Sequence, residues 1–260
     1  MPDADNDHST SRNADRGNPT SATDWFATTH WTLVAAVGDQ DSPAAAAALE
    51  ELCRTYWQPL YAYVRRRGHS REDAEDLTQG FFARLLERND LVGLSPDRGR
   101  FRAFLLAAFN HFLANEWKYR RRLKRGGAGN PLSLDWREAE SRYAALGMDG
   151  GSPDRLYDRA WVVTLLDRVL ARLAEECAAE GKGGVFARLK GCLMLERGEI
   201  PYPDMARETG LSEGALRVAV HRLRRRYRGL LRREIARTLT RADQVDAELQ
   251  SLFAALEGRG

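Results

Sequence analysis

Cysteine is scarce in this chain of 260 residues, and strand-like patterns do not occur in it. The three cysteines, Cys53, Cys177 and Cys192, are an odd number without a C-x-x-C pair, which argues against a disulfide framework and a zinc site. No apolar run approaches the length of a transmembrane helix, and the polar start of the chain carries no secretory signal. We therefore expect an all-α, cytoplasmic protein without a metal or other cofactor.

An excess of charge of one sign is also missing. The chain has 40 basic residues against 37 acidic ones, a net charge of +3. A surface for nucleic acid would therefore have to arise from basic residues gathered in one segment of the chain. The hydrophobic content of 43% is enough for one or two compact cores.

Changes in composition divide the chain into five parts. Residues 1–23 are polar and predict a disordered tail. Residues 24–125 predict a first helical domain, and the glycine-rich residues 126–153 a flexible linker. Residues 154–238 predict a second helical domain, and residues 239–260 an amphipathic helical extension.

Local signals place the helices of both domains. A helix begins at Ser42-Pro43 and runs to Arg67, and Ser70 caps the next one, with Asp73 at its third position. The buried stripe of this second helix consists of Ala74, Leu77, Phe81, Phe82 and Leu85. Further helices are predicted from Arg100 to Arg122, from Leu156 to about Glu180, from Val185 to Leu195, and from Asp243, as its cap, to Leu256.

The segment from Tyr202 to Arg237 predicts a helix-turn-helix. Ala206 is small enough for two helices to cross closely, Gly210 suits a left-handed turn, and Ser212 can cap the second helix. Such a motif commonly places its second helix in the major groove of DNA.

The second helix of this motif has two distinct faces. The face expected to be buried consists of Ala215, Leu216, Ala219, Leu223, Tyr227 and Leu230, and the opposite face of Arg217, His221, Arg224 and Arg228. A basic stripe of this kind suits a phosphate backbone. The alternative is a solvated arginine face on a helical hairpin.

An acidic helix occurs in the first domain. In the sequence DAEDLTQGFFARLLE, residues 73–87, Asp73, Asp76 and Gln79 lie away from the apolar stripe and could face a basic partner. Taken alone, acidic residues at a helix start also suit the helix dipole. No histidine or nucleophile accompanies them, so we expect no catalytic residue.

Two motifs in this order resemble the bacterial RNA polymerase sigma factors of the extracytoplasmic function (ECF) group. Residues 73–87 look like the helix by which these factors dock on the clamp coiled coil of core polymerase. Tyr202 to Arg226 is similar to their DNA-reading helix-turn-helix almost position by position, including Ser212 to Gly214 and the pair His221-Arg222. The resemblance implies a factor that is not an enzyme. Its partners would be core RNA polymerase and promoter DNA, and an anti-sigma factor would be a further partner.

The resemblance also implies a role for individual residues. Contacts to core polymerase would come from Asp73, Asp76 and Gln79. Capture and melting of the minus-ten element would involve Asn110, Trp117, Lys118, Tyr119, Arg120 and Arg121. Recognition of the minus-thirty-five element would involve Ser212, Glu213, Arg217, His221, Arg222, Arg224, Arg225 and Arg228. Flat rings alternating with cations at 117–120 suit separated bases and their backbone. Where many relatives have an acidic residue and a Ser-Arg pair, this chain has Ala114 and Val218-Ala219.

Three alternatives stay open at this stage. The chain could be a dimeric helix-turn-helix regulator that binds operators without engaging polymerase. It could be a metal-dependent nuclease, whose cleavage would depend on a divalent ion and on Asp73 or Asp76. The extension at 243–256, with Val245, Leu249, Leu252, Phe253 and Leu256 on one face, could pack back onto its own domain or act as a lid over Arg217.

Overall fold

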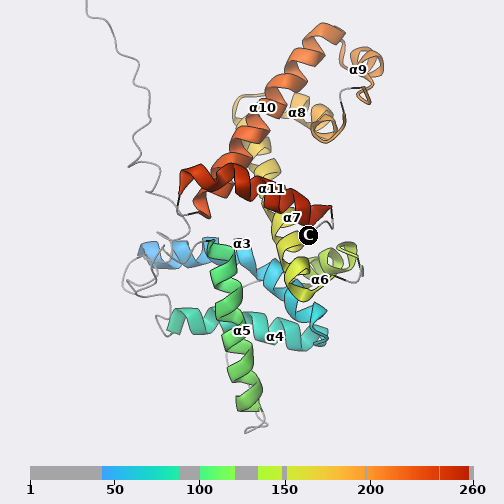
Figure 1. Ribbon diagram of the computed structural model, residues 1–260. Coiled ribbons are helices and arrows are strands. Elements are labelled where there is room, and N and C mark those ends of the chain that lie inside the picture. Colours follow the sequence, from blue (N-terminus) through green and yellow to red (C-terminus); the bar gives the residue numbers. More distant parts are fainter. Residues whose placement is uncertain are drawn as a thin grey trace, which may run out of the picture.

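A computed structural model describes residues 43–87, 100–120, 134–147, 151–196, 198–239 and 241–257 (Figure 1). Every regular element in these ranges is helical, which confirms the expected all-α class. The elements are α3 (Pro43–Arg66), α4 (Arg71–Glu87), α5 (Phe101–Arg120), α6 (Trp136–Ala145), α7 (Pro153–Ala179), α8 (Gly183–Leu189), η3 (Lys190–Leu193), α9 (Tyr202–Thr209), α10 (Glu213–Arg237), η4 (Ala242–Gln244) and α11 (Val245–Leu256). The predicted tail at 1–23 lies outside the described residues.

The boundary between α3 and α4 follows the local signals in the sequence. Gly68 adopts a φ of 89°, a left-handed conformation that ends the first helix. The Asp73 N–H then donates a hydrogen bond to the Ser70 Oγ (3.1 Å), and the Ser70 hydroxyl donates to an Asp73 carboxylate oxygen (3.1 Å). This reciprocal cap confirms the predicted start of α4. All five side chains of the predicted apolar stripe on α4 are buried.

Helices α4 and α5 cross closely because the contact on α4 is a glycine. A Cβ atom at Gly80 would lie 3.4 Å from the Phe112 ring. Beside this point the rings of Phe81 and Phe109 are 4.8 Å apart. Phe101, Phe109 and Phe112 are buried, whereas Phe104 is only partly so. Most of the aromatic side chains in the first two-thirds of α5 are therefore part of the hydrophobic core.

The predicted linker at 126–153 contains a helix that the glycine content did not suggest. Helix α6 begins after Asp135, whose carboxylate accepts backbone N–H groups of the first turn, and it packs against α3. The Trp57 and Trp136 rings meet edge to face at 5.3 Å, and Arg65 pairs with Glu140 (2.8 Å). The Arg65 guanidinium and the Tyr61 hydroxyl hold the pKa of the Glu140 carboxyl below its usual value. At least residues 136–145 are thus part of the folded body.

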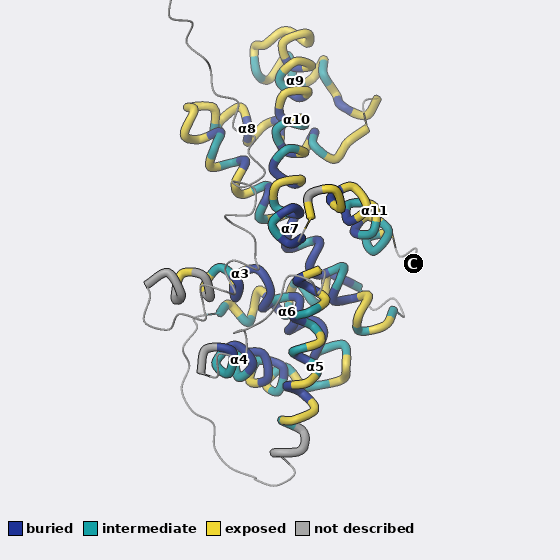
Figure 2. The backbone as a smooth tube through the Cα atoms, turned by 60° about the vertical axis from the view of Figure 1, so that its left-hand side comes forward, coloured by how far each residue is buried: buried dark blue, intermediate teal, exposed yellow. Residues whose placement is uncertain are grey.

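Helix α7 connects the two halves of the chain. Its 27 residues span about 40 Å at the usual rise of an α-helix. It packs along α3 near its start and against α10 and α8 further on (Figure 1). Figure 2 shows that many residues of α4 and α7 are buried, whereas most residues of α9 are exposed.

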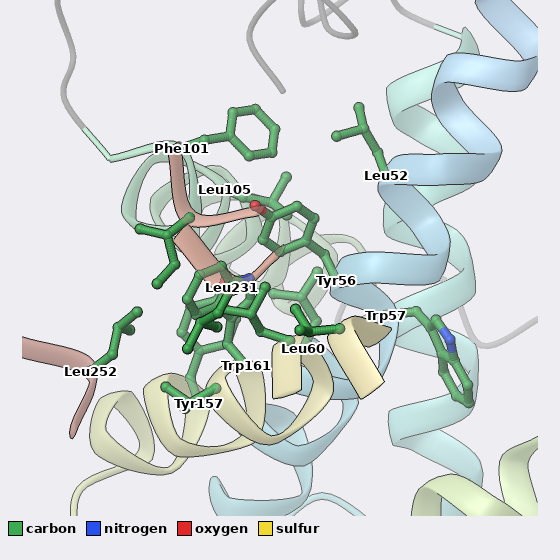
Figure 3. Close-up of a cluster of buried hydrophobic side chains, with 14 of the residues drawn as sticks. Leu52, Tyr56, Trp57, Leu60, Phe101, Leu105, Tyr157, Trp161, Leu231 and Leu252 are labelled. Carbon is green, nitrogen blue, oxygen red and sulfur yellow. The ribbon is translucent and has the colours of Figure 1, made fainter. Parts of the chain in front are cut away.

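Most of the buried hydrophobic side chains of both halves form one continuous cluster. Figure 3 shows Tyr56 from α3, Phe101 from α5 and Trp161 from α7 in this cluster, together with Leu231 from α10 and Leu252 from α11. Trp161 is 1% exposed. The two predicted domains therefore meet through a shared hydrophobic core at this point.

Helix α11 is amphipathic as predicted, but two details differ. Asp243 does not cap it. Its carboxylate pairs with Arg241 (2.7 Å), and the helix starts after Gln244 without a side-chain cap. Phe253 is 47% exposed, whereas Glu248 is buried beside Val245 and Leu252. The buried face thus includes a carboxylate that the apolar spacing did not reveal.

Candidate nucleic-acid interface

The helix-turn-helix at the end of the molecule has the predicted local geometry. Gly210 follows α9 with a φ of 70°, and its N–H donates to the Ala206 carbonyl (2.9 Å). The Ser212 Oγ accepts the Ala215 N–H (3.2 Å) and so caps α10. Ser212 is therefore occupied in orienting the helix whose first turns carry the candidate DNA contacts.

Replacing Gly210 by alanine should destabilise this motif, because a Cβ atom makes the left-handed conformation unfavourable by about 1–2 kcal/mol. Gly229 inside α10 is a matched control. A Cβ atom there would meet only the end of the Arg233 side chain at 3.8 Å, so alanine should be neutral or stabilising by up to about 1 kcal/mol. Urea denaturation followed by circular dichroism measures both. Equal effects of the same sign would contradict the assigned role of Gly210.

The buried face of α10 differs slightly from the predicted one. Leu216, Leu223, Tyr227 and Leu230 are buried as expected, but Ala215 is exposed and Val220 is buried instead. Ala215 lies in the first turn of α10. Burial raises the pKa of Tyr227 to about 12, so the phenol stays neutral on the buried face of α10.

A hollow of about 310 Å³ opens between α9 and α10 on the predicted basic face. It is lined by Tyr202, Arg217, Val220, His221, Arg224 and Arg228. The Arg217 guanidinium lies over the Tyr202 ring, 4.7 Å from its centroid, and pairs with Glu213 (3.2 Å). Arg217 is thus presented to solvent in a restrained position near the start of α10.

Two of the arginines that were predicted to contact DNA differ from this pattern. Arg224 donates to the Cys192 carbonyl (2.7 Å) and to the Leu195 carbonyl, and so ties α10 to the segment around η3. Arg222 lies on another side of α10, where it lines a largely apolar hollow with Lys182 and Val185. His221, Arg225 and Arg228 are exposed. The face open to a nucleic acid therefore centres on Arg217, His221 and Arg228, with Arg225 beside it.

The acidic face of α4 is only partly exposed to solvent. Asp76 is exposed, whereas Asp73 and Gln79 are half-buried. Asp73 takes part in the cap with Ser70, which gives it a structural role that the sequence resemblance did not distinguish from docking. Asp76 is the better probe of this surface.

Helix α5 extends beyond its crossing with α4 (Figure 1). Asn110 lies before this free end, and its side-chain oxygen accepts hydrogen bonds from the Tyr63 hydroxyl (2.8 Å) and from Arg67 (2.8 Å). The amide therefore links α5 to α3. Trp117, Lys118, Tyr119 and Arg120 belong to the last turn of α5, but their side chains, like the whole of Arg121, lie outside the described residues.

Two features of the site were missed at the sequence level. The contact between the Tyr202 ring and Arg217 depends on the turn between α9 and α10, which brings together two residues that are 15 positions apart in the chain. The pairing of Glu248 with Arg100 and Arg102 joins α11 to the start of α5. In the sequence, this pairing was indicated only by Glu248, an acidic residue among the apolar positions of an amphipathic helix.

The fold and this geometry define an all-helical protein with a capped helix-turn-helix that presents arginines to solvent. Residues 52–123 match the family model of sigma-70 region 2, a stretch that includes most of α3 and all of α4 and α5. Searches of the curated proteins and of the solved structures find no match to this chain. Within the described part of the chain, no helix is both long and apolar enough to cross a membrane.

Proposed function

We propose that this chain is a sigma factor of the ECF group. It binds core RNA polymerase, recognises the minus-thirty-five and minus-ten promoter elements and promotes DNA melting in the cytoplasm, without being an enzyme. The observation that carries this proposal is the match of residues 52–123 to sigma-70 region 2. The helix-turn-helix with its restrained Arg217 supports the proposal, because upstream recognition needs a second DNA-binding part.

Each proposed contact belongs to a different element. The exposed side of α4, with Asp76, contacts core polymerase, and the free end of α5 contacts the minus-ten element. The exposed arginines of α10 contact the minus-thirty-five element, where phosphate contacts position the helix and base contacts specify the sequence. We leave Arg224 and Arg222 out of this last set because of the positions described above.

Run-off transcription with purified core polymerase tests this function. A promoter library supplied with core enzyme and this chain should yield transcripts from a defined subset of sequences, and core enzyme alone should not. Binding to specific DNA without retention on core polymerase would instead identify a helix-turn-helix regulator. Divalent-dependent cleavage of the template would identify a nuclease.

Asp76→Arg should weaken retention on core polymerase by about tenfold or more, because a reversed charge in a complementary interface is repelled. The side chain is exposed, so the fold should be unaffected. Pull-down with core enzyme measures the effect. Glu175→Arg on the exposed side of α7 makes the same change of charge at a site outside the proposed interface. Equal retention of both variants would contradict docking through α4.

A further inference from the structure

One large apolar side chain lies among the exposed arginines at the start of α10, which packs beside α9 at one end of the molecule (Figure 1). Val218 is 49% exposed. It belongs to the second turn after the Ser212 cap and directly follows Arg217. Because each helical residue turns by about 100°, Val218 points away from the buried Leu216 and Val220. It therefore lies near the middle of the face that projects furthest from the core.

Cations lie on both sides of this valine. Arg217 and His221 line the hollow between α9 and α10 on one side. Arg222 lines the hollow beside α8 on the other side. The exposed Arg225 follows Val218 by seven positions, which places it about two turns further along the same line of the helix. An apolar side chain between cations suits a ligand that is a polyanion and also carries an apolar group.

Neither burial nor helix propensity accounts for valine at this position. The side chain is exposed, and a β-branched residue forms helices less well than alanine because its χ1 angle is restricted there. One turn earlier, a Cβ atom at Gly214 would meet the Ser212 Oγ at 4.0 Å, so the glycine leaves the surface beside Val218 low. A ligand can therefore approach this part of α10 closely.

The C-terminal helix does not cover this face. Asp246 of α11 pairs with Arg232 of α10, about four turns beyond Val218. Arg217 itself is 61% exposed. Helix α11 thus packs onto its own chain, and the predicted alternative of a lid over Arg217 is wrong in its location.

We propose that Val218 contacts the methyl group of a thymine in the major groove of the minus-thirty-five element. This inference rests on the proposed function and adds the kind of base that the helix selects. Thymine is the one standard base with a methyl group at this edge, and an apolar side chain packs against it. The first turns of a recognition helix are the part that reaches base edges. Arg217, one position earlier, then contacts a neighbouring base pair.

A selection from random duplex DNA locates the thymine. The full chain, with and without core polymerase, retains duplexes from a random library, and sequencing identifies the positions at which thymine is enriched. With Val218→Ala, the thymine preference should disappear at one of these positions. Val185→Ala removes the same atoms from another exposed valine, on α8, and should change no preference. Both side chains are exposed, so both variants should fold, which circular dichroism verifies.

Replacing the selected thymine by deoxyuridine removes the methyl group alone and so tests the contact itself. The unchanged chain should bind the deoxyuridine duplex about fourfold more weakly, the effect of one buried methyl group. Val218→Ala should bind the two duplexes with less than a twofold difference, because its partner for the methyl group is missing. An equal loss for both proteins would overturn the inference, since the methyl group would then act without Val218.

Run-off transcription separates this inference from the proposed function. If core polymerase transcribes the selected promoter but the deoxyuridine duplex binds as well as the thymine duplex, the function holds and the inference is overturned. If the thymine preference depends on Val218 but core polymerase yields no transcript, the inference holds and the sigma-factor function is contradicted. Two further results would overturn the contact with thymine. One is a selection without an enriched thymine, and the other is a Val218→Ala chain whose sole defect is weaker retention on core polymerase.

Discussion

Trp161→Ala should lower the free energy of unfolding by about 3–5 kcal/mol, the range for removing a large aromatic side chain from a core. Trp161 is 1% exposed and lies among side chains from α3, α5, α10 and α11 (Figure 3). Because this core is shared, both halves should lose stability together, in one cooperative transition. Urea denaturation followed by far-ultraviolet circular dichroism and by tryptophan fluorescence measures the change.

Arg172→Ala on the same helix is the matched control. Its side chain is 65% exposed, so the free energy of unfolding should change by less than about 0.5 kcal/mol. If Trp161→Ala produces two separate transitions of which only one is shifted, the halves have independent cores, contrary to the packing around α7.

Arg217→Ala and Arg225→Ala should impair DNA binding in different ways. Arg217 is restrained by Tyr202 and Glu213 near the start of α10, the part of a recognition helix that meets base edges. Its loss should cost about 1–3 kcal/mol at one promoter position and relax specificity there. Arg225 is exposed beside this face and should contact phosphate. Its loss should weaken binding to all sequences and lower the slope of log affinity against log salt by about 1.

Binding of a set of promoter variants at several salt concentrations distinguishes the two effects. Tyr202→Leu removes the ring on which Arg217 lies, while Tyr202→Phe retains it. We expect Tyr202→Leu to relax specificity at the same position as Arg217→Ala, and Tyr202→Phe to leave it intact. A uniform loss of affinity in both arginine variants would refute the division between base and phosphate contacts.

The sequence by itself determined most of the helices and many of their ends, although it missed α6. Ser70 and Ser212 cap α4 and α10 as predicted, and Gly210 adopts the left-handed turn. These features depend on groups within a few residues of one another, so local chemistry is sufficient to specify them. For the same reason, helical spacing identified the apolar stripe of α4 and most of the buried face of α10.

Only the tertiary structure decided how the charged side chains are used. Arg224 and Arg217 belong to the same predicted stripe, yet Arg224 binds carbonyls near η3 while Arg217 faces solvent. Glu248 looked like one polar residue of an amphipathic helix, but its arginine partners are more than 140 positions away in the chain. Likewise α6, which lies inside the glycine-rich segment, and α7, which follows it, both pack on α3. Helical periodicity shows which side of a helix is apolar, but the partner of a long charged side chain depends on which helices pack beside it.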